Sequence, residues 1–384
     1  MRRIVVVVGT VVICMFSSLS VLQAADGEGI RTEGYVISPY AELQSIYDSN
    51  VETQPNNTKS DVSFTLKAGA DFRNTAEKIK LKGDIWGLTE KYIDLKAEDH
   101  SDFGESLDVK WLDLGSFTMG VNESYQDIQS LDYSVGRIEA RKLLKAGIGA
   151  GNKITDKLDV NLDYLFSDTA YESPRMYSWN EQTVTFVGAN NLTDKSAGTL
   201  TVAAGNQTSD GNQANGKLLT ALVGVKSRQT DKVVGNAGIG VIRYSGEADA
   251  SRFAFVAGVN WTATPKVNVF VDARNGFEPG TIDANNVNFV SHATLGADWA
   301  FVDSLALKGF VMYSRNDYIK DVVSNEVLSK KKDDTMTEAL RLTYTAPAKF
   351  LQIFLEGKYE DKTSTISANE YSQTMVTLGA KYIY

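Results

Sequence analysis

The sequence predicts an all-β protein: a transmembrane antiparallel up-and-down β-barrel of about 18 strands, with 16 as the alternative count. Three observations lead to this fold class. Apolar and polar residues alternate along many short segments, long and short connections alternate between the segments, and the chain ends on an amphipathic stretch closed by Tyr384. Beyond the N-terminal region no apolar stretch approaches the ~20 residues of a spanning helix, so strands must make any membrane crossing.

The N-terminus has the features of a secretory signal peptide. Arg2 and Arg3 precede the apolar run IVVVVGTVVICMF, and the small and polar stretch SSLSVLQAA follows it. Cleavage near Ala24 or Ala25 removes Cys14, the one cysteine of the chain, and changes the formal net charge from −9 to −11 because two arginines are lost. A lipoprotein anchored at Cys14 is the less favoured alternative, because Ile13 precedes the cysteine where a small residue is expected. The expected domains are a signal peptide at 1–24, a short periplasmic segment at 25–34, too short for a plug domain, and the barrel at 35–384.

The strands are predicted from a period of two residues. In LDVNLDYLF, from Leu158, and in VSFTLKAGADFR, from Val62, apolar residues occupy every second position and polar residues the positions between them. About 18 such segments divide the mature chain into lengths that fit membrane-crossing strands. They begin near Tyr35, Ser60, Glu77, Gly104, Phe117, Ala140, Lys157, Ser178, Ser196, Gly216, Val233, Ser251, Lys266, Val287, Ser304, Asp334, Ala348 and Ser372.

The connections between these segments alternate in length. Odd-numbered segments are followed by long polar stretches such as DSNVETQPNNT, GFEPGTIDANN and DVVSNEVLSKKK, and even-numbered ones by tight turns such as RNT, KITD, QTD and TAP. A soluble β-sandwich has no reason to gather its long loops at one end, whereas outer-membrane barrels do. We therefore expect short periplasmic turns, long extracellular loops, and a location in the outer membrane of a Gram-negative-type bacterium.

The last segment is predicted to close the barrel. An open sheet edge in lipid would leave backbone groups unpaired, so the final strand must pair with the first. VTLGAKYIY resembles the C-terminal signal that the barrel-insertion machinery reads in bacterial outer-membrane proteins; an ordinary amphipathic strand of a soluble domain is the alternative. The residues of the expected assembly signal are Val376, Leu378, Tyr382 and Tyr384.

The side of each strand that faces lipid can be assigned from the cost of burying a charge there, which is about 2–4 kcal/mol for Lys or Arg near the midplane. Aromatic residues near strand ends fall on the apolar side, as interfacial belts do; these are Tyr313, Tyr344, Tyr359, Tyr382, Trp261 and Trp299. The segment VVGNAGIGVIRYSGE is ambiguous, because either Arg243 or the pair Gly238 and Gly240 must face lipid.

The polar side of the strands is predicted to line a water-filled lumen, since 18 strands leave an aqueous interior. Charges of both signs on that wall suit a channel for small hydrophilic solutes; alternatively, they pair with one another and only keep the wall hydrated. Trp86, Phe270, Phe310 and Phe354 are also predicted to point inward, either to stack on sugar rings or to fill space beside neighbouring strands. The candidate pore-lining residues are Lys67, Asp71, Arg73, Asp84, Asp159, Asp163, Asp272, Arg274, Lys308, Arg341, Glu356, Lys358 and Lys381.

Catalysis, metal binding and nucleic-acid binding are not favoured. His100 stands in EDHSDF, on a predicted long loop beside Ser101 and Asp102, and adjacent loop residues rarely converge into a catalytic triad. Cofactors and metals are not expected, because Cys and His clusters are missing and SDGNQANG lacks the calcium-loop spacing. The net negative charge disfavours nucleic acid, and the run KKK at 330–332, followed by two aspartates, is interpreted as a solvated loop.

The first predicted strand ends in Tyr47, Asp48, Ser49, Asn50 and Val51, and later strands open on turns such as TDK and TATPK. In these features the chain resembles the beta-barrel porin 2 family, outer-membrane barrels often encoded beside exopolysaccharide export genes. It implies an outer-membrane, porin-like role.

The first functional hypothesis is passive diffusion of small hydrophilic solutes or ions. The second is an accessory or structural barrel for exopolysaccharide export or envelope assembly, and an enzyme is a distant third. The expected partners are outer-membrane lipid, the insertion machinery and small solutes; barrels of this size often associate as trimers, so a homotrimer is one option.

Overall fold

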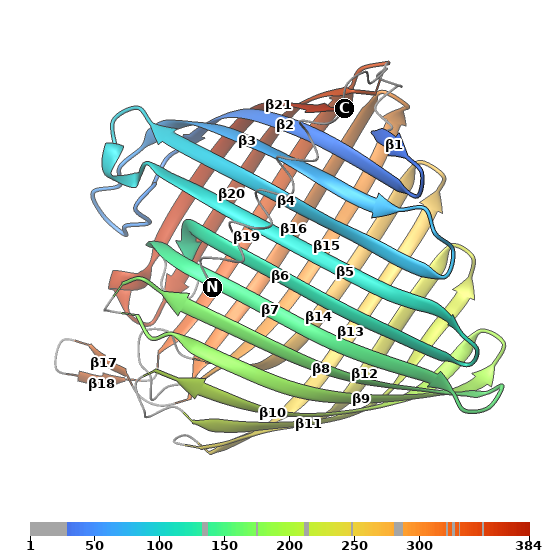
Figure 1. Ribbon diagram of the computed structural model, residues 1–384. Coiled ribbons are helices and arrows are strands. Elements are labelled where there is room, and N and C mark those ends of the chain that lie inside the picture. Colours follow the sequence, from blue (N-terminus) through green and yellow to red (C-terminus); the bar gives the residue numbers. More distant parts are fainter. Residues whose placement is uncertain are drawn as a thin grey trace.

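The protein is described by a computed structural model that covers residues 29–132, 137–173, 176–210, 215–246, 249–279, 287–319, 322–324, 327–329, 331–347 and 349–384. The predicted signal peptide lies outside these residues. One sheet of nineteen strands dominates the structure. In this sheet β1 (Ile30–Thr32) pairs with the start of β2 (Tyr35–Asp48), and the other eighteen strands form a closed antiparallel ring. Figure 1 shows the tilted strands of this barrel from the side.

The strands of the ring follow one another in chain order around the barrel, each antiparallel to its neighbours. After β2 they are β3 (Asp61–Asn74), β4 (Ile79–Tyr92), β5 (His100–Leu114), β6 (Phe117–Asp132), β7 (Arg137–Lys153), β8 (Leu158–Tyr171), β9 (Trp179–Thr193), β10 (Ser196–Ser209), β11 (Gly216–Thr230), β12 (Val233–Ser245), β13 (Ala250–Thr264), β14 (Val267–Pro279), β15 (Val287–Val302), β16 (Leu305–Tyr318), β19 (Lys332–Thr345), β20 (Leu351–Ser364) and β21 (Tyr371–Ile383). The long connections hold the hairpin of β17 (Val322–Ser324) and β18 (Val327–Ser329) and the 3-10 turns η1 (Lys96–Glu98) and η2 (Ser367–Asn369).

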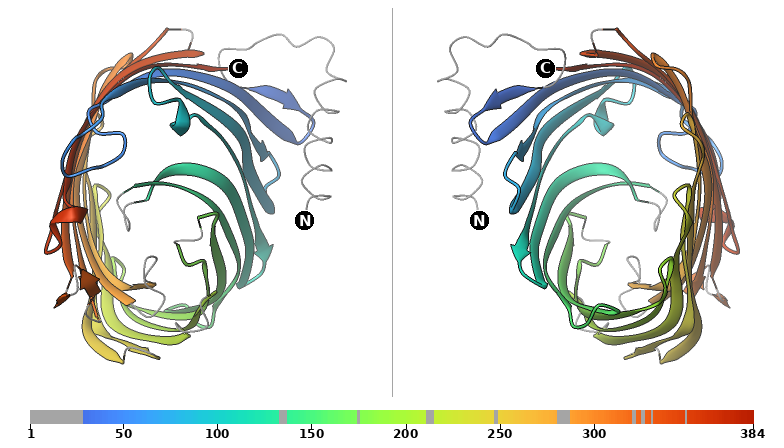
Figure 2. Two further views of the ribbon diagram at one scale, coloured as in Figure 1. Left: turned by 90° about the vertical axis from the view of Figure 1, so that its left-hand side faces the viewer. Right: turned by 90° about the vertical axis from the view of Figure 1, so that its right-hand side faces the viewer.

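The ring is closed by β21 pairing with β2, as the amphipathic C-terminus predicts. Ser45 of β2 lies opposite Leu378 of β21, and the Tyr384 N–H donates to the Pro39 carbonyl at 2.9 Å. The end-on views of Figure 2 show blue β2 beside red β21 at the top of the ring. Pairing the first strand with the last satisfies backbone groups that hydrocarbon would otherwise leave without partners.

The predicted all-β class and the count of eighteen barrel strands are confirmed. Each strand begins within four residues of its expected start, and those at Tyr35, Phe117 and Ser196 begin where the sequence placed them. The largest difference is β5, which begins at His100 and not near Gly104. Pairing with β4 continues through the polar residues to the Glu90–His100 pair, and polarity alone gave no sign of it.

The two ends of the barrel differ as the alternation of connections predicts. Short turns such as 154–157 and 194–195 lie at one end, at the right of Figure 1, together with β1. The longer connections, including those with η1, η2 and the β17–β18 hairpin, lie at the other end. No helix in the described ranges combines the length and apolar character needed to cross a membrane.

Cross-strand partners share a face of the sheet, so the register sorts side chains into two sets. One set is apolar and exposed, with Leu43, Leu66 and Leu378 at 60%, 51% and 58% exposure. The other set includes Glu360 and Lys362, at 1% and 3%. Side chains on the concave side of a ring shield one another, so the second set faces the interior and the apolar set faces outward.

The outer face carries the predicted aromatic belts. The six predicted tyrosines and tryptophans all lie on it with 42–47% exposure. The ambiguous strand β12 is settled by its register: Arg243 shares the outer face with Ile239 and Val241, and Gly238 and Gly240 face inward. Arg243 stands near the long-loop end of β12, where its guanidinium can reach the polar interface.

Candidate functional site: the inner wall

The register places all thirteen predicted pore-lining residues on the inner face. Those on β3 and β4 form cross-strand rows, with Asp71 opposite Asp84 and Arg73 opposite Lys82. Asp159 and Asp163 lie on β8, where the Asp163 carboxylate covers Gly149 of β7. The others are Asp272 and Arg274 on β14, Lys308 on β16, Arg341 on β19, Glu356 and Lys358 on β20 and Lys381 on β21.

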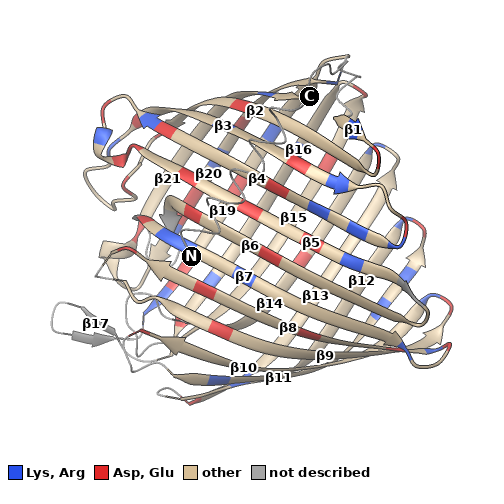
Figure 3. Cartoon of the chain, in the orientation of Figure 1, with Lys and Arg blue, Asp and Glu red and all other residues tan. Residues whose placement is uncertain are grey.

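The inner wall of β15, β16 and β19–β21 and, across the closure, of β2–β5 carries charges of both signs. Several of them pair: Lys308 with Asp298 at 3.5 Å, Arg341 with Glu356 at 3.7 Å, and Lys358 with Glu360 at 3.1 Å. Red and blue segments recur along β3, β4 and β5 in Figure 3. In this part of the wall, several of the charged side chains therefore pair with one another, which was the alternative to a role in solute selection.

Aromatic rings on this wall also take up cations. Lys67 Nζ lies 4.2 Å from the Trp86 ring, Lys381 Nζ 4.6 Å from the Tyr40 ring, and Arg341 Cζ 3.5 Å from the Phe354 ring. Cations attracted to ring faces in this way are held close to the wall. Trp86 and Phe354, predicted to point inward, thus serve as platforms for neighbouring basic residues.

A hollow at the short-turn end joins β1 to β5. Its volume is about 670 Å³, and it gathers basic side chains with three carboxylates: Arg31, Arg73 and Lys82 with Asp71, Asp84 and Asp108. The Ser106 hydroxyl donates to Asp84. Asp71, Arg73 and Asp84 were predicted from the sequence to lie on this wall, whereas Arg31, Lys82 and Asp108 were not.

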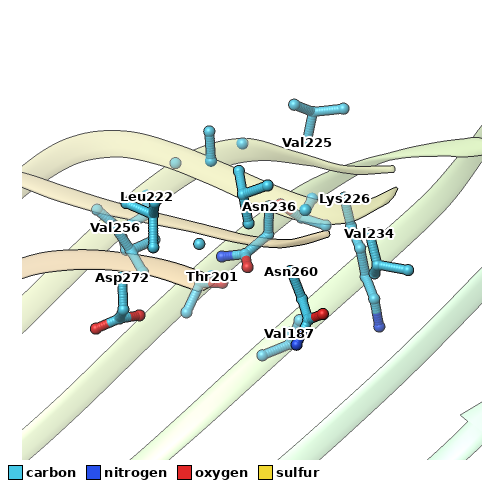
Figure 4. Close-up of a pocket in the computed structure, with 18 of the residues that line it drawn as sticks. Val187, Thr201, Leu222, Val225, Lys226, Val234, Asn236, Val256, Asn260 and Asp272 are labelled. Carbon is cyan, nitrogen blue, oxygen red and sulfur yellow. The ribbon is translucent and has the colours of Figure 1, made fainter. Parts of the chain in front are cut away.

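The inner wall of β9 to β13 is different, because most of its inward side chains are uncharged: small, aliphatic, amide and hydroxyl groups. A second hollow of about 540 Å³ lies here, lined by Thr199, Thr201, Asn236, Asn260 and Asp272 among others. In Figure 4 the side chains of Thr201, Asn236, Asn260 and Asp272 point to one side of the sheet, and Val225 points to the other. Asn236 was not predicted because the side of β12 that faces the lumen was ambiguous, and Asn260 on β13 was not predicted either. The available signal was glycine recurring on three neighbouring strands, at 224, 238 and 258.

A buried polar network at the long-loop end was missed by sequence reasoning. Lys331 and Lys362 share the Asp333 carboxylate at 3.2 and 3.4 Å, and Tyr371 Oη donates to Glu360 at 2.5 Å. The interpretation of the lysine run as a solvated loop is wrong for Lys331, which is 2% exposed and donates to the Tyr318 hydroxyl. Burial lowers the pKa of Lys331. The period-two run of Lys358, Glu360 and Lys362 was the available signal.

His100 lies on β5 and points inward, not on a loop as expected. Its Nε2 is 3.5 Å from Glu90 and 3.7 Å from Asp102, and Nδ1 is 2.8 Å from the Glu98 carbonyl oxygen. Ser101 faces the other side of the sheet, where it meets Thr89 at 3.0 Å. The HSD sequence therefore does not assemble a nucleophile beside its histidine. Across the described ranges, the His, Cys, Asp and Glu side chains form no group of three suited to a metal ion.

The family model described as "Putative beta-barrel porin 2" matches residues 202–383, which run from β10 to the last residue of β21. The chain is similar to this family over these residues. It is a porin-like β-barrel of the Gram-negative outer membrane, as the sequence predicted.

Several solved structures are similar to this chain in fold. Pseudomonas aeruginosa OpdK with vanillate is 11% identical, with a TM-score of 0.48, covering 91% of this chain and 99% of its own. Acinetobacter baumannii OccAB4 is 10% identical, with a TM-score of 0.49 and coverages of 91% and 98%. Pseudomonas aeruginosa OccK3 is 13% identical, with a TM-score of 0.47 and coverages of 90% and 96%. No curated protein matches the chain.

Proposed function

We propose that this barrel is a passive channel for small hydrophilic solutes or ions, with the thirteen predicted residues along the path. The observation that carries the proposal is the sorting of side chains in a closed ring of eighteen strands: apolar groups outside, charges and amides inside. Rings of 16–18 strands are wide enough to hold water along their axis. A hydrated polar wall lowers the cost of moving a polar solute past hydrocarbon.

We propose that selectivity depends on two sectors of the inner wall. The charged sector consists of β15, β16, β19–β21 and β2–β5, and the neutral sector consists of β9–β13. Ions would meet the charged sector, where Arg341, Glu356 and Lys358 alternate in sign across β19 and β20. Uncharged solutes would meet the neutral sector, where Asn236 and Asn260 offer amides. A wall of mixed sign supports modest ion selectivity.

Reconstitution in planar bilayers tests the proposal. The purified barrel should give ohmic current steps of one fixed size. A chain shortened to end at residue 350 lacks β20 and β21, cannot close, and should give none. Silence of the full-length protein under conditions where a control porin conducts would reject the channel function.

A second candidate is an accessory barrel for exopolysaccharide export. The neutral sector of β9–β13 favours it, because an uncharged polymer would meet few fixed charges there. Deletion of the gene should then change the amount of secreted polymer and leave the uptake of small sugars unaltered. Loss of sugar uptake with normal polymer secretion would favour the channel role instead.

A further inference from the structure

Five aromatic side chains of the inner wall lie against glycines on neighbouring strands, and one of them, Tyr244 over Gly216, is fully buried. The other four share one arrangement. Trp86 covers Gly104, Tyr40 covers Gly69, Phe354 covers Gly379, and Phe270 covers Gly296; a Cβ at any of these glycines would overlap the ring. A ring against glycine lies close to the sheet, so one of its faces is turned toward the lumen. The wall thus presents four aromatic platforms built in the same way.

Three of these platforms are covered by side chains of the protein itself. The cationic groups of Lys67, Lys381 and Arg341 lie over the rings of Trp86, Tyr40 and Phe354, respectively. Phe354, under its arginine, keeps only 2% exposure.

Phe270 differs from the other three. It has no cation or ring partner among the residues that the structure describes, and it is partly exposed in the 540 Å³ hollow. Phe310 continues the platform on the far side of Gly296 in the same cross-strand row.

Polar side chains surround the open face of Phe270. Asn260 lies directly opposite it on β13, and Asp272 follows it two residues later on the same face of β14. The Oδ1 atom of Asn236 and the Oδ2 atom of Asp272 both lie over Gly258, which stands between them in one row. Within the described chain Asn236, Asn260 and Asp272 have no side-chain hydrogen-bond partner, and all three are exposed to the lumen.

We propose that this hollow binds an uncharged pyranose ring of a passing sugar, a proposal that rests on solute entry to the lumen. A pyranose has an apolar face of C–H groups and an edge of hydroxyls, so it needs one flat apolar surface flanked by donors and acceptors. Phe270 supplies the surface, and the two amides and the Asp272 carboxylate supply the hydrogen bonds. The volume falls within the ~300–1,000 Å³ typical of small-molecule sites.

The chemistry of the hollow favours a neutral ligand over an ion. One carboxylate, Asp272, and one ammonium, Lys226, lie in the lining, so neither sign of ligand charge is matched by several groups. An aromatic face adds little for an inorganic ion compared with a ring that stacks on it. Sugars also keep much of their hydration in such an open site, so binding is expected to be weak and rapidly reversible, as passage requires.

Calorimetry on the detergent-solubilised barrel tests this site without needing ion conduction. The probes are maltotriose and cellotriose, with sorbitol as a polyol that has hydroxyls but no ring. Phe270→Leu keeps bulk over Gly296 and removes the flat ring, whereas Trp86→Leu is the matched change at a platform already occupied by lysine. Asn260→Ala removes an amide without touching the contact with Gly296.

The expected result is binding of at least one trisaccharide by the wild type, weakened about 3- to 10-fold by Phe270→Leu and unchanged by Trp86→Leu. Asn260→Ala should weaken it as well, which keeps the test valid if the Phe270 variant does not fold. No trisaccharide binding by the wild type, equal loss in both leucine variants, or equal binding of sorbitol would overturn the site. Current steps without sugar binding would refute this inference alone, and silent bilayers would refute the channel function, on which sugar passage depends.

Discussion

Two neighbouring residues on β10 can test which side of each strand faces lipid and which faces the lumen, and every functional statement depends on that assignment. Leu200 lies on the outer face with 45% exposure, between Gly188 and Val223. Thr199 lies on the inner face between Ala189 and Gly224, with room for a longer side chain. Replacing each in turn with arginine adds the same charge at nearly the same height, once toward lipid and once toward the lumen.

The position of Leu200 fixes the expected cost. It lies four residues above the first residue of β10 at the short-turn end, which is about 13 Å along the strand. With a tilt near 40°, this is about 10 Å along the membrane normal, close to the middle of an apolar band about 25 Å tall. Leu200→Arg should therefore lower the free energy of unfolding by about 2–4 kcal/mol, or about 30- to 700-fold in the folding equilibrium.

Thr199→Arg should cost much less, because its guanidinium meets water and neighbouring small residues. The assay is reversible guanidinium unfolding of barrels folded into lipid vesicles, followed by tryptophan fluorescence. Bilayer recordings of the same variant should show smaller steps and a shift toward anions. If Thr199→Arg destabilises the barrel as much as Leu200→Arg does, the assignment of inner and outer faces is wrong.

Three further predictions concern other parts of the barrel. Arg341→Ala leaves Glu356 as the nearer charge on β20 and should shift the reversal potential in a KCl gradient toward cations, with Glu356→Gln shifting it the other way. Glu360→Ala removes a carboxylate that is 1% exposed and should cost about 3–5 kcal/mol in denaturant unfolding, against less than about 0.5 kcal/mol for Asp361→Ala on the outer face. Replacing Tyr384 with serine should slow membrane assembly, whereas phenylalanine should not, as read by the fraction of heat-modifiable barrel in SDS gels.

Sequence alone predicted the strands because their period of two is enforced by the two solvents that they separate. A shift of one residue in the register of β20 would turn Glu356 and Lys358 toward lipid. Strict alternation is therefore needed to keep these charges in water, and it makes the strand recognisable in the sequence. The start of β5 was harder to predict. His100 and Asp102 extend a strand whose inner and outer residues are both polar at that height, and no alternation marks it.

The buried network at the long-loop end shows a second limit. Lys331 precedes β19, and its charge suggests solvent, yet it joins Asp333 and Lys362 against the inner wall. Contacts of this kind depend on how a connection folds back over the ring. The strand pattern determines where the ring lies, and it says little about what covers the end of it.

The hollow on the inner wall of β9–β13 was not predicted from the sequence, for a different physical reason. Glycine has no side chain to contribute to either face, so a strand such as β12, with Gly238 and Gly240, loses the alternation that would orient it. Gly238 also lines the hollow that holds Asn236 and Phe270, so its missing side chain leaves room there for a solute. In a barrel of this kind, charged residues that face the lumen can therefore be predicted from the alternation of the sequence. Surfaces formed beside glycines, where uncharged solutes can bind, cannot be predicted in this way.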